Sequence, residues 1–161
     1  MPTEHISAKE FRITQGLSVK GVAEVKPKKP HTREESAFEK EFAFIANRFD
    51  MLYFKIPDPI YSKDKIETMR NKGRSDEHKR PFDGVLITKG QNYCIEFKVG
   101  YKALSPHQIH NERKINQINI SFLVIRKLPK DYRVDWFGKQ HKFDTIIDMC
   151  RWIYELTGDD E

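Results

Sequence analysis

The spacing of apolar side chains changes along the chain, and each period predicts a different element. From position 34 apolar residues recur at helical spacing over roughly sixteen residues, which predicts one amphipathic helix packed on a core. These residues are Phe38, Phe42, Ile45 and Phe49. A short apolar run from Leu52 to Ile56 then predicts a strand that ends at the following Pro-Asp-Pro segment.

Two further runs predict a β-hairpin. Residues 83–88 (DGVLIT) and 93–98 (YCIEFK) are typical of strands, and residues 89–92 (KGQN) are typical of the turn between them. If positions 88 and 93 pair, the register sets two pairs opposite each other: Val85 with Glu96, and Asp83 with Lys98. All four side chains then share one face, whereas the opposite face of the second strand is apolar and suits a core.

Four more segments complete the predicted order. Ser105 and Pro106 favour the start of a helix that runs to about Asn116. Residues 120–125 (ISFLVI) favour a strand that is covered on both faces. A weaker strand over 132–137 and a closing helix over 143–156 follow. The pattern therefore predicts an α/β fold, a mixed β-sheet flanked by helices.

Length and composition suit a single core. With 161 residues, of which 38% are hydrophobic, we expect one domain over residues 34–161 after an N-terminal arm over residues 1–33. Cys94 and Cys150 are isolated in predicted core elements, which indicates buried thiols in a reducing compartment and neither a disulfide framework nor a zinc site. The apolar stretches are too short to cross a bilayer and a secretory h-region is missing, so we expect a cytoplasmic protein.

Basic residues are in excess and concentrate in two segments. The net charge of +5 favours polyanionic partners. A Lys- and Pro-rich run over residues 26–30 predicts a flexible basic arm, which is either a solubilising tail or a phosphate-tracking segment, with a short helix over residues 7–15. Residues 61–80 form a long polar connection, either a solvated loop or a segment along a substrate groove.

The hairpin also carries candidate chemistry. Asp83 and Glu96 lie at diagonal spacing with Lys98 beside them, a set that can hold a hard divalent cation and a water positioned for attack. The simpler interpretation is an exposed hairpin with a salt bridge. Glu35, Glu39 and Glu41 lie on or beside the apolar stripe of the first helix, and one of them can add a third carboxylate.

Four short motifs occur in order over residues 37–125. They are Phe38-Glu39-Lys40, Lys55-Ile56-Pro57-x-Pro59-Ile60, Asp83 with the hairpin Gly90 and Glu96-x-Lys98, and Pro106-His107-Gln108-Ile109. With these motifs the chain resembles the PD-(D/E)XK nuclease superfamily, and within it the RecU-type Holliday junction resolvases, with archaeal Hjc-type and phage-encoded relatives. The resemblance implies a restriction-endonuclease-like core of order αβββαβ. In this chain Phe82 separates Pro81 from Asp83, and the connection 61–80 is shorter than the stalk region of RecU-type proteins.

Carried over position by position, the resemblance implies a metal-dependent endodeoxyribonuclease. Glu39, Asp83 and Glu96 would bind Mg²⁺, for which Mn²⁺ substitutes, with the Phe97 carbonyl as a further ligand. Lys98 would orient or deprotonate the attacking water, and Gln108 would position the water or the scissile phosphate. No small-molecule cofactor is expected.

The resemblance also implies a homodimer that makes paired incisions in a four-way DNA junction. Residues expected to contact DNA are Lys28, Lys29, Lys55, Arg74, Lys79, Arg80, Lys102 and His107. One alternative is a nuclease of the same fold that cuts flaps, nicked duplex or foreign DNA. The other is a DNA-binding module without catalysis, for which the basic arm and the 61–80 connection suffice.

Overall fold

A mixed six-stranded sheet forms the centre of the protein in this computed structural model, which describes residues 30–74 and 79–156. The strands follow chain order across the sheet: β1 Leu52–Lys55, β2 Gly84–Ile87, β3 Asn92–Val99, β4 Ser121–Lys127, β5 Tyr132–Trp136 and β6 Lys139–Phe143. Neighbouring strands are antiparallel except β3 and β4, which are parallel and are joined through a helix. The predicted mixed α/β sheet is therefore confirmed.

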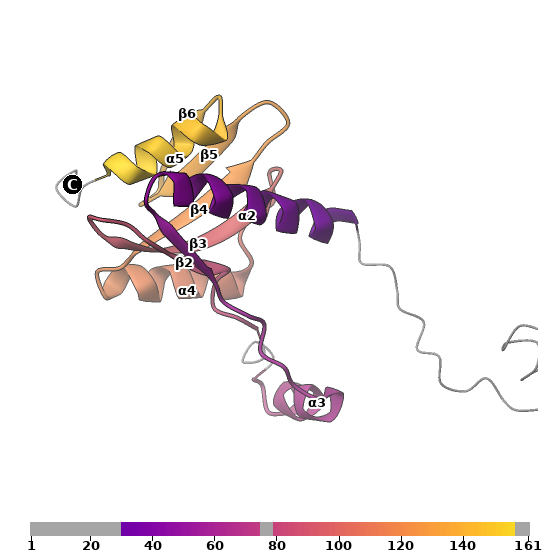
Figure 1. Cartoon of the computed structure of the whole chain (residues 1–161). Coiled ribbons are helices and arrows are strands. Elements are labelled where there is room, and N and C mark those ends of the chain that lie inside the picture. The colour runs from indigo at the N-terminus through magenta and orange to yellow at the C-terminus, as the bar shows by residue number, and fades with distance from the viewer. Residues whose placement is uncertain (1–29, 75–78, 157–161) are drawn as a thin grey trace, which may run out of the picture.

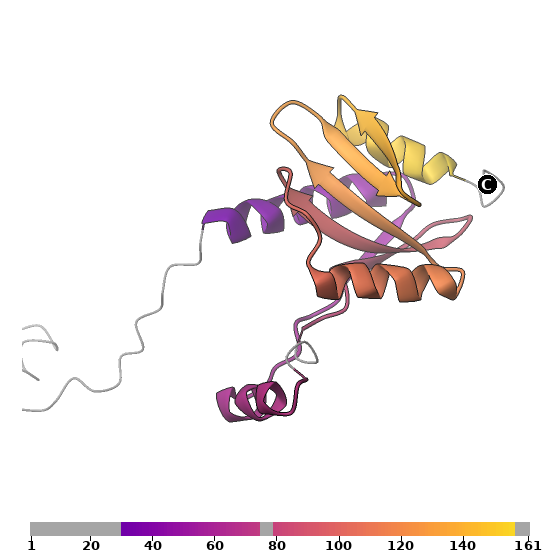
Figure 2. The same cartoon turned by 180° about the vertical axis from the view of Figure 1, so that it is seen from behind.

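Helices cover both faces of this sheet (Figures 1 and 2). On one face lie α2 (Pro30–Arg48) and α5 (Ile146–Glu155), and on the other lies α4 (Pro106–Gln117). Leaving aside the extra helix α3, the elements from α2 to β4 follow the order αβββαβ expected of the core. Residues 1–29, with the predicted short helix and Lys28 and Lys29, lie outside the described residues, and α2 begins at Pro30.

The main core lies between the sheet and the α2–α5 layer. Most of its fully buried members come from both helices and from the four central strands, among them Phe38, Phe42, Leu86, Tyr93, Ile95, Phe97, Leu123, Ile125, Val134, Met149 and Ile153. A smaller cluster under α4 joins Ile115 to Cys94, Phe122 and Val124. The five residues Ser121–Ile125 are all buried, which confirms the predicted strand with both faces covered.

The remaining core prediction concerns the cysteines. Cys94 and Cys150 are both free and buried, as expected. At the border of the main core, Trp136 and Trp152 pack edge to face at 6.0 Å between ring centroids.

The connection 61–80 is not a plain solvated loop, so that alternative was wrong, whereas its other predicted alternative, a position along a substrate groove, stays a prediction. It contains α3 (Lys63–Asn71), which stands away from the body at the end of two extended segments (Figure 1). Ser62 caps this helix by accepting a hydrogen bond from the Lys65 amide. None of the α3 residues is buried, so the helix has no apolar stripe that periodicity could detect.

The C-terminal elements differ from the prediction in a similar way. Strand β6 was not predicted, because its sequence KQHKF is polar and occupies an exposed edge of the sheet. Phe137 and Gly138 both have positive φ, 48° and 73°, and this tight turn reverses the chain from β5 into β6. The last helix consequently begins at Ile146, not at position 143, with Thr145 as its N-cap.

The hairpin register is shifted by two residues from the predicted one. Leu86 pairs with Tyr93 and Gly84 with Ile95, so Val85 lies opposite Cys94, not opposite Glu96. The turn is shorter because the Thr88 amide and hydroxyl both donate to the Gln91 carbonyl, at 3.2 and 2.7 Å. A shift of two residues keeps the parity of the strands. Asp83, Glu96 and Lys98 therefore still belong to one face, with Asp83 now level with Glu96.

Candidate active site

Asp83 lies immediately before β2 and is fixed from three sides. Its amide donates to the Ile95 carbonyl at 3.0 Å, and its carbonyl accepts from the Ile56 amide at 2.9 Å. Its side chain is only 6% exposed; Oδ2 accepts from the Phe97 amide at 2.7 Å and Oδ1 contacts the Arg80 guanidinium at 2.5 Å. Backbone pairing to β3 thus holds this carboxylate in one position.

Glu96 lies in the middle of β3 and is 3% exposed. Its Oε1 accepts from the Lys98 ammonium at 2.9 Å and from the Gln108 side-chain amide. Lys98 comes from the same face of the strand two residues later, so strand periodicity brings the pair together. Gln108 comes from the first turn of α4 on the other side of the cleft.

The cap of α4 determines how Gln108 is presented. Ser105 is the N-cap, and its hydroxyl accepts from the Gln108 amide at 3.3 Å, while Gln108 Oε1 accepts from the Ser105 amide at 2.9 Å. In this reciprocal capping box the side-chain oxygen of Gln108 is occupied by the helix end. Only its nitrogen is directed to the Glu96 carboxylate.

Glu39 reaches the site from α2 and is 7% exposed. Its oxygens accept from the Tyr53 hydroxyl at 2.7 Å and from the Lys55 ammonium at 2.5 Å. The Tyr53 ring lies directly over Gly84, where an added Cβ would come within 2.3 Å of the hydroxyl oxygen. A glycine at this position therefore makes room for the group that orients Glu39.

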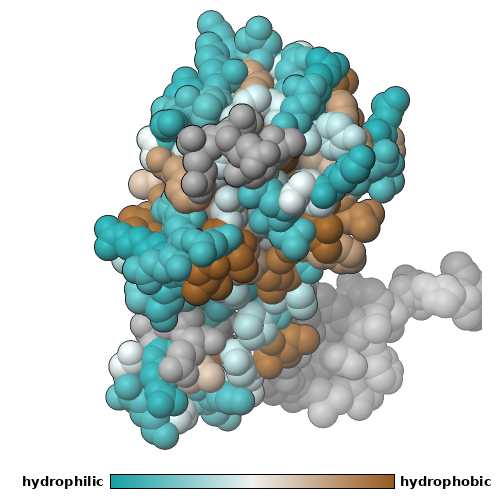
Figure 3. Space-filling model, turned by 90° about the vertical axis from the view of Figure 1, so that its left-hand side faces the viewer, coloured by the Kyte–Doolittle hydropathy of each residue, from teal (hydrophilic) through white to brown (hydrophobic). Residues whose placement is uncertain are grey.

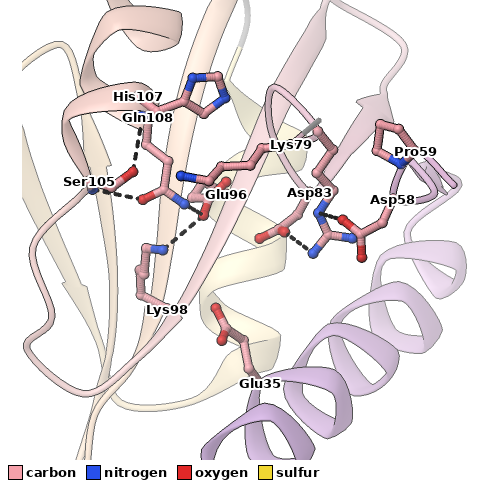
Figure 4. Close-up of a pocket in the computed structure, with 11 residues that line it drawn as sticks. Glu35, Asp58, Pro59, Lys79, Asp83, Glu96, Lys98, Ser105, His107 and Gln108 are labelled. Atoms are coloured by element: carbon pink, nitrogen blue, oxygen red, sulfur yellow. Dashed lines mark hydrogen bonds and ion pairs between the residues drawn. The ribbon is translucent and has the colours of Figure 1, made fainter. Parts of the chain in front are cut away.

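The structure distinguishes the three glutamates left open by helical geometry. Glu41 is paired with Lys127 at 3.3 Å and its side chain is 44% exposed, so it belongs to the surface. Glu35 points from α2 into the cavity that contains Asp83 and Glu96 (Figure 4). Glu39 borders the adjoining cavity, and both Glu35 and Glu39 thus lie close to the hairpin.

Burial and mutual repulsion disfavour the charged forms of Asp83 and Glu96. Burial raises the pKa of Glu96 to about 7, with repulsion from Asp83 adding to the shift and Lys98 opposing it. The pKa of Asp83 is also raised by burial, and Glu39 adds to that effect, whereas the Phe97 amide and Arg80 oppose it. Tyr53 has a raised pKa because it is buried and donates to Glu39. The carboxylates therefore sit close enough to repel one another.

Two adjoining cavities surround these groups. The first, of about 510 Å³, is lined by Asp83, Glu96, Lys98 and Gln108 together with Lys79, Arg80 and His107 (Figure 4). The second, of about 540 Å³, lies between α2 and the segment after β1 and includes Glu39 and Lys55. Glu35, Asp58, Arg80 and Asp83 line both, so the two cavities are lobes of one open cleft.

The basic residues predicted to contact DNA divide into two groups. Lys79, Arg80 and His107 line the first lobe and Lys55 lines the second. Arg74 follows α3 and Lys102 follows β3; both are exposed and line neither lobe.

Sequence reasoning missed several residues of the site. Asp58 pairs with Arg80 at 3.5 Å, and Arg80 also donates to the Ile56 carbonyl at 3.3 Å, which ties the two limbs of the connection together beside Asp83. The Pro57-Asp58-Pro59 turn was the available signal for Asp58. Tyr53 had no such signal, because its contact with Glu39 joins two elements fourteen residues apart.

The carboxylates are each paired with a cation of the chain itself. Arg80 contacts Asp83, Lys98 contacts Glu96 and Lys55 contacts Glu39. Across residues 30–74 and 79–156, no three His, Cys, Asp or Glu side chains already have the spacing of a metal site. Among the same residues, no helix has the length and apolar character needed to cross a membrane.

Comparisons with known proteins give distant likenesses among solved structures alone. No protein-family model matches the sequence, and no curated protein matches it significantly. Among solved structures the chain is similar to the Hjc Holliday junction resolvase of Archaeoglobus fulgidus, an archaeal hyperthermophile, with a TM-score of 0.44 and 15% identity. The alignment covers 71% of this chain and 92% of that chain. A likeness this distant carries no conclusion about activity, so the function has to be inferred from the site.

Proposed function

We propose that this protein is a metal-dependent endonuclease of the PD-(D/E)XK superfamily that cuts DNA at four-way junctions by paired incisions. The observation that carries the proposal is the meeting of Asp83, Glu96, Lys98 and Gln108 in one open cleft, with Glu39 beside them. The motifs that resemble RecU-type and Hjc-type resolvases contain these same five residues. Phosphodiester hydrolysis needs stabilisation of developing negative charge and an activated water, and this set suits both tasks.

The donor set fits a hard divalent cation such as Mg²⁺, with Mn²⁺ as a substitute. Two buried carboxylates with raised pKa values repel each other, and a cation on their oxygens relieves that repulsion. Asp83, Glu96 and the Phe97 carbonyl would hold it, with Glu39 or Glu35 as the third acidic group. When bound, such a cation activates the phosphodiester as a Lewis acid and neutralises part of its charge.

The side chains of the protein itself have separate tasks in this proposal. Lys98, whose side chain is 13% exposed, is held by Glu96 and provides an ammonium that orients the attacking water and offsets charge on the pentavalent phosphorus. Gln108 fixes the Glu96 carboxylate through the capped end of α4. Arg80 balances the charge of Asp83 and, released from it, can contact a DNA phosphate.

Cations around and beyond the cleft favour a DNA partner. Lys79 and His107 border the catalytic lobe, and Lys55 borders the second lobe. The protruding α3 adds the exposed residues Lys63, Lys65 and Arg70. Such contacts to phosphates position a nucleic acid without reading its bases, so they suit recognition of DNA shape.

An uncovered part of the sheet supports the proposed homodimer. Leu52 pairs with Ile87 on β1 and β2, and Phe54 lies two residues further along β1; these side chains are 51%, 39% and 54% exposed. Hydrophobic side chains also gather in a band across the face seen in Figure 3. An apolar surface beside the free edge of β1 suits a twofold contact with a second copy. The free thiols suit a reducing compartment, which favours the cytoplasm.

A substrate panel tests the proposed function. Labelled four-way junction, flap, nicked duplex, linear duplex and single-stranded DNA are incubated with the protein in Mg²⁺, Mn²⁺ or EDTA. Paired, metal-dependent nicks in the junction alone support a resolvase. Equal cutting of flaps or nicked duplex supports a nuclease of broader substrate range, and tight binding without cutting in any metal contradicts the enzymatic proposal.

A further inference from the structure

The second lobe of the cleft has features that the metal site does not require. Arg33, Ala37 and Lys40 line it from α2, and Lys55 lines it from β1. Positions 33, 37 and 40 share one face of the helix, because they are four and then three residues apart. The small side chain of Ala37 leaves the space between the two cations open.

The charged side chains of this lobe differ in whether they form ion pairs. Four acids line the lobe, and three of them contact cations of the chain: Glu39 contacts Lys55, and Asp83 and Asp58 contact Arg80. Arg33 and Lys40, in contrast, are exposed and make no ion pair within the described part of the chain. Two cations are thus available at the wall of a cavity of about 540 Å³.

The position of the second lobe, next to the catalytic lobe, indicates which kind of anion it would bind. It shares Asp83 and Arg80 with the catalytic lobe, so a polymer that places one phosphate at Asp83 continues directly into it. Lys40 follows Arg33 by seven positions, which is a rise of about 10 Å along the helix. One DNA strand advances about 3.4 Å per nucleotide along the duplex axis, so this distance corresponds to about three nucleotides.

We infer that Arg33 and Lys40, with Lys55 opposite, form a phosphate subsite that holds the backbone of the cleaved strand within about three nucleotides of the scissile bond. The inference rests on the proposed nuclease function and deepens it. The ligand class is the phosphodiester backbone, because Arg33 and Lys40 are exposed cations at the wall of the lobe, and none of the described residues that line it is an aromatic on which a base would stack.

Neutralising the two helix cations tests this subsite. Arg33→Gln and Lys40→Gln, singly and together, are compared with Arg48→Gln, which removes an exposed cation at the other end of the same helix. Binding of a fluorescent junction is measured in EDTA as a function of salt. In the double variant the slope of log affinity against log salt should be shallower by about two units, one for each lost phosphate contact. The Arg48 variant should leave the slope unchanged.

Neutral phosphates in the DNA locate the contact. Once the wild-type cut position is mapped, single methylphosphonates are placed one to three nucleotides to each side of it. They should weaken binding by the wild type on one side of the cut and have a smaller effect on the double variant. An unchanged salt slope, or an equal effect of the methylphosphonates on both proteins, overturns the subsite. If the wild type cuts no DNA, the proposed nuclease function fails. The salt dependence of binding still tests whether Arg33 and Lys40 contact phosphates.

Discussion

Gly84 gives the sharpest structural test, because one methyl group there should disturb both the core and the site. The substitution Gly84→Ala would place its Cβ 2.3 Å from the Tyr53 hydroxyl oxygen and 2.4 Å from two ring carbons. Ordinary contact begins at about 3.4 Å, so the ring has to move by roughly 1 Å. Tyr53 packs edge to face on Phe42 and Phe97, so the ring cannot move without disturbing these contacts.

The expected loss is about 1–3 kcal/mol of unfolding free energy, the usual cost of overpacking a core. Urea unfolding followed by tryptophan fluorescence measures this cost. The control is a double-mutant cycle: in a Tyr53→Ala background the added methyl should cost less than about 0.5 kcal/mol, because the ring is gone. An equal cost of Gly84→Ala in both backgrounds would contradict a clash with the Tyr53 ring, and so would full stability of the single variant.

Three further predictions follow from the site, the core and the surface. Mg²⁺ or Mn²⁺ should raise the melting temperature of the wild type, and EDTA should reverse this rise. In Glu96→Gln the metal-induced rise should be smaller. An identical rise in that variant contradicts Glu96 as a ligand. Burial raises the pKa of Cys94 to about 11 and that of Cys150 to about 12. Both thiols should therefore resist alkylation at pH 8 in the folded protein and react fully in urea. Rapid labelling of the folded protein would contradict their burial. Leu52→Lys should shift the protein towards monomer, measured by light scattering after size exclusion. Lys89→Ala, at the exposed hairpin turn, is the control. An unchanged mass of the Leu52 variant excludes this surface as the dimer contact.

The parts of the fold that could be predicted are those with an apolar face. The helix around Phe38, the strand at residues 121–125 and the capped helix after Ser105 each bury a regular set of side chains or carry a defined cap. Helix α3 and strand β6 were missed for the opposite reason. Both are polar and largely exposed, so neither leaves a hydrophobic period in the sequence.

The candidate site was predictable to the extent that strand parity determines it. Asp83, Glu96 and Lys98 were assigned to one face, and that survived a two-residue error in register because side chains repeat every two residues. Contacts between distant elements could not be predicted in this way. The hydrogen bond from Tyr53 to Glu39 and the Arg80–Asp58 pair depend on how α2 and the connection pack against the sheet.

The central claim is that Asp83 belongs to a metal-dependent site for cutting branched DNA. The most direct measurement compares wild type and Asp83→Asn on a labelled four-way junction in Mg²⁺ and in EDTA, with binding followed in parallel. We expect paired nicks by the wild type in Mg²⁺ only and loss of cleavage in the variant. The variant should bind the junction equally or more tightly, because a carboxylate that repels phosphate has been removed. Metal-dependent cleavage that persists in Asp83→Asn would contradict a catalytic role of the Asp83 carboxylate.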